Sequence, residues 1–184
     1  MVEIKSLTQL AISDFHRLVV GYTSDARYQA KKVDTPEKVE FSLDLVPINP
    51  PYQKRWPILP EDLERYQRIV GEGFSLGAFK EQQMVGIALA EPHRWNGSLW
   101  VWEFHVEDAY RGKGIGLCLM NALADKARVA GFRVLVLETQ NTNVPAIRFY
   151  RKAGFEVEGI DLSYYSNTDI TDGEIAIFMK RKIL

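Results

Sequence analysis

A glycine-rich stretch between basic residues carries the clearest chemical signal in this sequence. Residues 109–120 read AYRGKGIGLCLM, in which Arg111 and Lys113 alternate with glycines and a third glycine follows at 116. Glycine lets the backbone turn sharply and leaves its N–H groups uncovered, and the apolar helix that follows adds its positive N-terminal end. Such a loop either holds a pyrophosphate or is a tight surface turn with solvated charges. The spacing is neither that of a P-loop nor the Gly-x-Gly-x-x-Gly of dinucleotide-binding folds.

Three residues are candidates for proton transfer. In LWVWEFHV, residues 99–106, strand alternation places Glu103 and His105 on one face. A carboxylate among so many apolar side chains should be paired or functional. His105 is either a rival base or a core histidine. Glu138, which ends the apolar run VLVLE, either serves as a second base, binds a cationic acceptor or forms a strand-end salt bridge.

Hydrophobic periodicity predicts the elements that position these residues. The stretch 7–22 indicates a helix, and 39–46 alternates as a half-buried strand with Val39, Phe41, Leu43 and Leu45 on one face. The stretch 47–60 holds five of the eight prolines and is expected to be irregular. Helices are predicted over 61–70, 117–130 and 144–153, a hairpin over 74–92, and strands over 99–106, 132–139, 159–166 and 173–184. Six or seven strands with about four helices predict a mixed sheet of the α/β or α+β class in one domain, 1–184.

Composition excludes several classes of protein. The 184 residues carry a formal charge of −1, which indicates neither a general nucleic-acid surface nor a membrane surface. The N-terminal residues lack the pattern of a signal peptide, so a cytoplasmic protein is expected. Cys118 is the only cysteine, which excludes an internal disulfide and a Cys-rich metal site, and we expect its thiol to be buried.

Two motifs together resemble the GNAT superfamily of acetyl-CoA-dependent N-acetyltransferases. RGKGIG matches Arg/Gln-x-x-Gly-x-Gly/Ala. NTNVPAIRFYRKAGF matches Asn-x-x-Ala-x-x-x-Tyr-x-x-x-Gly-Phe through Asn143, Ala146, Tyr150, Gly154 and Phe155. The resemblance covers a cofactor core of about residues 99–160. It implies a GNAT-like fold with a mostly antiparallel sheet, acetyl-CoA as co-substrate without a metal, and direct acetyl transfer to an amine in a ternary complex.

The same resemblance implies roles for individual residues. Tyr150 would protonate the leaving thiolate, and Glu103 would accept the proton of the amine, with Glu138 as the third catalytic candidate. The expected cofactor-binding residues are Phe104, His105, Val106, Arg111, Gly112, Lys113, Gly114, Ile115, Gly116, Asn143, Ala146 and Tyr150. Two of these have simpler interpretations, because Tyr150 can pack against Phe149 and Asn143 can cap its helix.

Several segments are similar to the streptothricin acetyltransferases within this superfamily. They are RWNGSLWVWEFHV, LETQNTN, FYRKAGF, IDLSYYSN and EIAIFM. The similarity implies a small-molecule amine acceptor, such as a streptothricin-like antibiotic, and a role in antibiotic resistance. Aromatic faces attract cations, so the expected acceptor-binding residues are Trp95, Trp56, Tyr28 and Tyr165. Each of them can instead pack under a loop.

Other functions remain open at this point. The acceptor is alternatively a metabolite amine or a protein or peptide amine, and the chain is alternatively a non-catalytic sensor of acyl-CoA. A Rossmann-type oxidoreductase is contradicted by the glycine spacing. The chain is expected to be a monomer or a homodimer.

Overall fold

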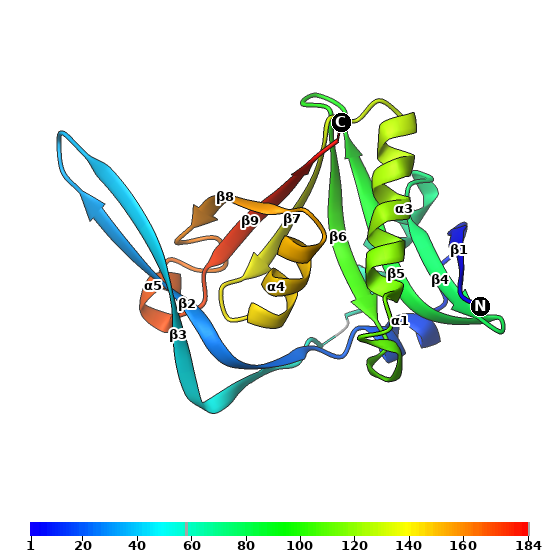
Figure 1. Cartoon of the computed structure of the whole chain (residues 1–184), viewed down its shortest axis with the longest axis horizontal. Coiled ribbons are helices and arrows are strands. Elements are labelled where there is room, and N and C mark those ends of the chain that lie inside the picture. The colour runs from blue at the N-terminus through cyan, green and yellow to red at the C-terminus, as the bar shows by residue number, and fades with distance from the viewer. Residues whose placement is uncertain (58, 184) are drawn as a thin grey trace. The chain divides into compact units, whose positions relative to one another are not determined.

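The computed structural model describes residues 1–57 and 59–183 (Figure 1). Its helices are α1 Ile12–Leu18, α2 Pro60–Gly71, α3 Ile115–Val129, α4 Val144–Lys152 and α5 Asp169–Asp172, with a short 3-10 turn η1 at Asp108–Tyr110. Its strands are β1 Glu3–Ser6, β2 Tyr22–Asp34, β3 Val39–Lys54, β4 Leu76–Lys80, β5 Gln83–His93, β6 Ser98–Val106, β7 Val134–Gln140, β8 Glu156–Asp161 and β9 Ala176–Lys182. Each helix within the described ranges is too short or too polar to span a membrane.

Hydrogen bonding orders the main sheet as β1-β4-β5-β6-β7-β9-β8, and β2 pairs with β3 in a separate sheet. The pairs β1·β4, β4·β5 and β5·β6 are antiparallel, whereas β6 and β7 are parallel. The prediction of a mixed sheet with six or seven strands is therefore confirmed. Its membership differs from the expectation, because β1 joins this sheet and the predicted strand at 39–46 does not.

The chain divides into two compact units. The first comprises Met1–Val20, Trp56–Leu137 and the C-terminal residues from Lys180, and the second comprises Gly21–Arg55 and Glu138–Met179. Neither unit is a continuous stretch of sequence.

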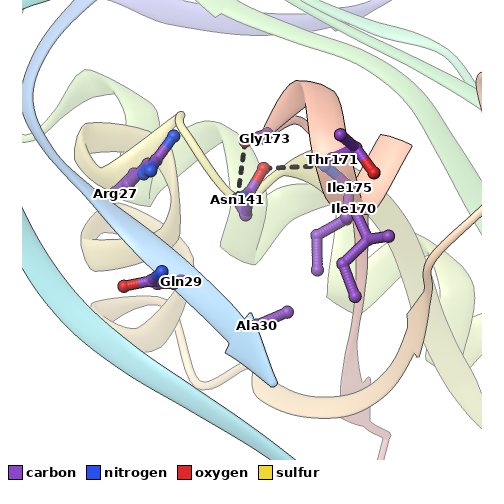
Figure 2. Close-up of a pocket in the computed structure, with 8 residues that line it drawn as sticks. All are labelled: Arg27, Gln29, Ala30, Asn141, Ile170, Thr171, Gly173 and Ile175. Atoms are coloured by element: carbon purple, nitrogen blue, oxygen red, sulfur yellow. Dashed lines mark hydrogen bonds between the residues drawn. The ribbon is translucent and has the colours of Figure 1, made fainter. Parts of the chain in front are cut away.

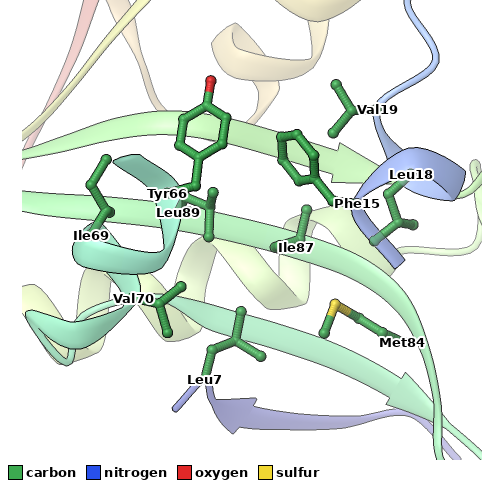
Figure 3. Packing of buried hydrophobic residues seen from close by; sticks show 10 residues of the cluster. All are labelled: Leu7, Phe15, Leu18, Val19, Tyr66, Ile69, Val70, Met84, Ile87 and Leu89. Carbon is green, nitrogen blue, oxygen red and sulfur yellow. The ribbon is translucent and has the colours of Figure 1, made fainter. Parts of the chain in front are cut away.

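The core of the first unit lies between β5 and two helices (Figure 3). Ile87 and Leu89 alternate on β5 toward α1 and α2 and are fully buried, as the period of a strand requires. Helix α1 adds Phe15 and Leu18, and α2 adds Tyr66, Ile69 and Val70. Helix α3 covers the opposite face of the sheet with a buried stripe at helical spacing, which includes Leu119, Met120 and Leu123.

The second unit carries the β2–β3 hairpin, drawn in blue and cyan in Figure 1, whose tip lies away from the other elements of the unit. The pairing runs from Tyr22↔Lys54 to Asp34↔Val39 with one irregularity between Ser24 and Ala26. Midway along β2 the hairpin is joined to the chain after β7, because the N–H of Tyr28 donates to the carbonyl of Asn141 at 3.0 Å.

Several predictions made from the sequence are wrong, among them the strand over 159–166, because β8 is Glu156–Asp161. Residues 47–54 belong to β3 rather than to an irregular stretch, and Ile58 lies outside the described residues. The helix expected over 7–22 is confined to α1, and strand β2, rich in polar residues, was not predicted. The face of Val39, Phe41 and Leu45 is exposed rather than half-buried, and Cys118 is exposed on α3 rather than buried.

Candidate active site

The glycine loop has the geometry of an anion cradle in the first unit. Gly112 and Gly114 adopt φ values of +72° and +82°, and a Cβ on either would meet no atom within 4 Å. Gly114 is the N-cap of α3, and Gly116 lies inside that helix rather than in the loop. The first N–H groups of a helix have no partner within it, and they carry its partial positive charge. An open loop at the start of a 15-residue helix fits a pyrophosphate.

The two basic side chains of the loop fold back on its own backbone. Arg111 donates to the carbonyl of Val106 at 3.0 Å and pairs with Asp108 at 2.9 Å. Lys113 donates to the carbonyl of Ala109 at 2.9 Å. These side chains therefore brace the loop, and the predicted anion contact rests chiefly on the backbone.

Replacement of Gly114 by alanine tests this cradle. We expect Gly114→Ala to raise the KM for acetyl-CoA about tenfold or more, because the new Cβ enters the space open to a phosphate and φ is strained. Gly131→Ala is the matched control, since Gly131 has φ +78° and open space around its Cβ in the same unit. Thermal unfolding should show a similar loss of stability in both variants, and steady-state kinetics should show a raised KM for acetyl-CoA only in Gly114→Ala; equal KM values in the two variants would refute the cradle.

Strand β6 brings Glu103 and His105 to the same face, as alternation predicted. Nε2 of His105 lies 2.6 Å from one carboxylate oxygen of Glu103, and the hydroxyl of Tyr66 donates to the other. The side chains of His105 and Glu103 are 11% and 19% exposed, respectively. The Trp56 ring meets His105 edge-on at 5.8 Å between centroids. The carboxylate is thus held in place and still reached by solvent.

Tyr66 is the member of this group that sequence reasoning missed. It lies on α2, packs against Phe15 at 5.0 Å between centroids, and points its hydroxyl out of the core (Figure 3). In the sequence it is one apolar position of an amphipathic helix, 37 residues before Glu103. The one available signal was a hydroxyl on a buried helix face, because such a group normally has a polar partner.

The burial of Tyr66 predicts a loss of stability at alkaline pH. Burial first, and then the charge of Glu103, raise the pKa of Tyr66 above its usual value near 10. Above about pH 10 the unfolded chain ionises this tyrosine and the folded chain does not, so the free energy of unfolding falls as pH rises. We expect this fall to be shallower in Tyr66→Phe than in the wild type when urea unfolding is measured from about pH 9 to pH 11. Parallel curves would contradict the assignment.

Strand β6 pairs with β5 along its whole length but with β7 over only its first part. Its pairing with β7 runs from Ser98↔Val134 to Val101↔Leu137, and no further pair follows within the described residues. The register with β5 passes from Ala90↔Val101 to Leu89↔Glu103, so Trp102 is an extra residue, that is, a β-bulge. A bulge bends its strand and ends regular pairing. This leaves the backbone of the segment that includes Phe104, His105 and Val106 as the predicted donors to an acetyl oxygen.

Helix α4 in the second unit carries the second motif as predicted. The side chain of Asn143 accepts from the N–H of Ala146 at 3.3 Å, so the capping role is present. Tyr150 is 9% exposed, and its ring packs against Phe149 at 5.5 Å and Phe155 at 5.8 Å between centroids. Its packing is compatible with the predicted role, which remains a proposal.

Two acidic side chains of the second unit, Glu138 and Glu174, accept hydrogen bonds from tyrosines. Glu138, on β7, accepts a hydrogen bond from the hydroxyl of Tyr165. Burial and the charge of Glu138 raise the pKa of Tyr165. In the same unit, the carboxylate of Glu174 accepts a hydrogen bond from the hydroxyl of Tyr52 at 3.2 Å and forms an ion pair with Lys54.

The predicted acceptor-binding aromatics fall into different environments. Trp56 contacts His105, Tyr165 contacts Glu138, and Tyr28 lies half-buried on β2. Trp95 is 86% exposed in the turn before β6, eight residues before Glu103. At about 3.3 Å per residue this places Trp95 far from the carboxylate, so we leave it out of the proposed site.

A cavity of about 180 Å³ in the second unit contains none of the predicted site residues (Figure 2). Its lining is Arg27, Gln29, Ala30, Asn141, Ile170, Thr171, Gly173 and Ile175. Asn141 is used structurally, because its amide donates to the carbonyl of Gly173 at 3.2 Å and accepts from the N–H of Ile175 at 2.8 Å. We therefore do not assign the reaction to this cavity.

An open glycine loop at the start of a helix, beside a strand that carries a held carboxylate, is the arrangement expected of an acyl-CoA-dependent transferase. The model of the acetyltransferase (GNAT) family matches residues 46–155, and the chain belongs to this family. It is an acetyltransferase with acetyl-CoA as co-substrate.

Proteins similar to this chain include two streptothricin acetyltransferases and a nourseothricin acetyltransferase. The chain is 35% identical over 147 residues to streptothricin acetyltransferase of Streptomyces lavendulae, which covers 76% of this chain and 75% of that protein. It is 39% identical over 84 residues to streptothricin acetyltransferase A of Bacillus subtilis (strain 168), covering 46% and 48% of the two chains. The crystal structure of a nourseothricin acetyltransferase superposes with a TM-score of 0.73 at 27% identity, covering 100% of this chain and 99% of that one.

Proposed function

We propose that this chain acetylates a primary amine of a streptothricin-like antibiotic by direct transfer in a ternary complex. The observation that carries the catalytic part is the Glu103 carboxylate, held by Tyr66 and His105 and reached by solvent. A sensor of acyl-CoA has no need of a positioned base. The identity of the acceptor is supported by the relatives named above. A cytoplasmic location and a role in antibiotic resistance remain part of this proposal.

Different residues bind the co-substrate, remove a proton from the amine and donate a proton to the sulfur. When bound, acetyl-CoA supplies an activated acetyl group on a sulfur. The N–H groups from Gly112 to Gly116 hold the pyrophosphate, and Glu103 takes the proton that the amine loses as its nitrogen bonds to the acetyl carbon. Tyr150 gives a proton to the sulfur as the carbon–sulfur bond breaks. Glu138 with Tyr165 supplies a negative and aromatic surface for a cationic acceptor.

Thiol release from acetyl-CoA tests the proposal directly. The purified chain is given streptothricin in parallel with polyamines, amino acids and peptides. We expect fast release with streptothricin and acetylated antibiotic by mass spectrometry. Release with a different amine alone would keep the acetyltransferase and reject the antibiotic, and tight coenzyme A binding without release on any acceptor would favour the sensor.

A further inference from the structure

A lysine of the second unit lies against one carboxylate and one aromatic ring. Lys54 ends β3, and its ammonium group forms an ion pair with Glu174, which lies between α5 and β9. The same ammonium lies 5.9 Å from the centroid of the Tyr165 ring, within the range of a cation–π contact. The hydroxyl of that ring donates to Glu138. Two carboxylates, one phenol and one internal cation therefore form a continuous set of contacts.

Glu174 is also held by neutral donors. Its Oε1 accepts from the hydroxyls of Tyr52 and Thr142, each at 3.2 Å, while its Oε2 accepts from Lys54. The hydroxyl of Thr142 shares a hydrogen bond of 2.6 Å with the hydroxyl of Tyr22, whose side chain is buried. These donors do not depend on the lysine, so we expect the carboxylate to keep its position when the lysine is replaced. The side chains of Lys54 and Glu174 are 25% and 23% exposed, so a dissolved cation can reach them.

The contacts of Lys54 are those that a cationic acceptor would make. An ammonium ion is bound by a carboxylate and by the face of an aromatic ring, and Lys54 has both. Burial first, then the charge of Glu138 and also that of Glu174, raise the pKa of Tyr165, so both carboxylates act on this one ring. The lysine offsets one of the two negative charges. A second positive group that approached Glu174 would meet the ammonium of Lys54 and be repelled.

We propose that Lys54 is a specificity-determining residue that limits how many positive charges the acceptor surface binds. Lys54 occupies Glu174, so the surface binds one ammonium group of an acceptor at Glu138 and Tyr165 and disfavours a second. This inference rests on the proposed function, which places the acceptor at Glu138 and Tyr165. A like charge that excludes the wrong ligand is a common source of specificity.

Two substitutions should shift the charge preference in opposite directions. Lys54→Met leaves Glu174 to a second ammonium group, so dications should gain affinity relative to monocations. Glu174→Gln removes the carboxylate but keeps the lysine, so dications should lose affinity relative to monocations. The double variant has the formal charge of the wild type, and its preference should return toward the wild-type value. If the ion pair were only structural, both single variants would shift the preference in the same direction or in neither.

NMR titration of the full chain with butylamine and with putrescine measures this preference without turnover. The two probes share a four-carbon chain, and at neutral pH they carry one and two positive charges. We expect the ratio of the Kd of butylamine to the Kd of putrescine to rise about tenfold in Lys54→Met and to fall in Glu174→Gln. Glu174→Gln decides the case in which Lys54→Met fails to fold.

Lys31→Met is the matched control, because Lys31 pairs with Asp44 at 3.0 Å on the same hairpin and its side chain is 64% exposed. Its ratio should equal that of the wild type. An unchanged ratio in Lys54→Met, shifts of the same sign in the two single variants, or no binding of putrescine by Lys54→Met would overturn the proposal.

Thiol release separates this inference from the proposed function. A wild type that releases no thiol with any acceptor rejects the proposed function, whereas the titration still reports whether Lys54 sets the charge preference. A wild type that acetylates streptothricin, with variants that leave the Kd ratio unchanged, retains the proposed function and rejects the role of Lys54.

Discussion

Tyr150→Phe is expected to lower kcat by about 10²–10⁴-fold, the usual contribution of a positioned acid. A phenol has a reference pKa near 10, comparable to that of a thiol, so a tyrosine is a suitable donor to a departing thiolate. The substitution keeps the ring, and with it the contacts to Phe149 and Phe155. The affinity for coenzyme A, measured by calorimetry, should therefore be nearly unchanged.

Tyr110→Phe is the control for the loss of one hydroxyl, because Tyr110 lies in η1 with its ring near Lys80 and Lys113. It should retain wild-type kcat. Thermal unfolding of Tyr150→Phe separates chemistry from folding, since the side chain is nearly buried. Unchanged kcat in a folded Tyr150→Phe would show that another group protonates the thiolate.

Glu103→Gln should lower kcat/KM by about 10²-fold or more at neutral pH. An ordinary amine has a pKa near 10 and arrives as an ammonium ion, so the reaction needs a group that removes a proton. The glutamine keeps the size of the side chain but accepts no proton. The deficit should shrink as pH approaches the pKa of the acceptor amine, because free amine then becomes abundant in solution.

One control and two comparison variants test whether this effect is specific to Glu103. Glu91→Gln alters a carboxylate of β5 that accepts from the Trp102 indole at 2.6 Å, and it should leave the rate unchanged. His105→Gln and Glu138→Gln compare the two rival bases in the same assay. If either of these variants, and not Glu103→Gln, loses activity in the pH-dependent manner described, the base has been assigned to the wrong residue.

The chemistry-bearing parts of this protein were predicted better than its N-terminal third. The loop at 111–114, the alternation of Glu103 with His105, and the helix around Tyr150 depend on local spacing, which a single sequence displays. The bulge at Trp102 was not predicted, because it depends on the register with β5. Tyr66 was missed for a similar reason, since its contact with Glu103 joins residues that are 37 positions apart in the sequence.

The hairpin shows where periodicity stops being informative. Alternation correctly predicted which side chains of β3 share a face, but it does not specify what that face meets. Proline was interpreted as a break in structure at 47–54. The register passes from Ser24↔Tyr52 to Ala26↔Pro47, so Pro50 and Pro51 lie in the irregular part of β3, where a missing N–H costs no regular ladder hydrogen bond.

The extra residue in β6 limits where insertions and deletions can be tolerated in this chain. Deleting Trp102 would remove the bulge, so β6 would be straighter and would pair with β5 in a regular register. The side chains on one side of the deletion would then point to the opposite face of the sheet relative to those on the other side. Such a deletion would leave a well-paired sheet and abolish the arrangement around Glu103. The turn at 94–97 lies outside the paired residues of β5 and β6, so a change of length there leaves the register around Glu103 intact, and length variation among natural variants should avoid the middle of β6.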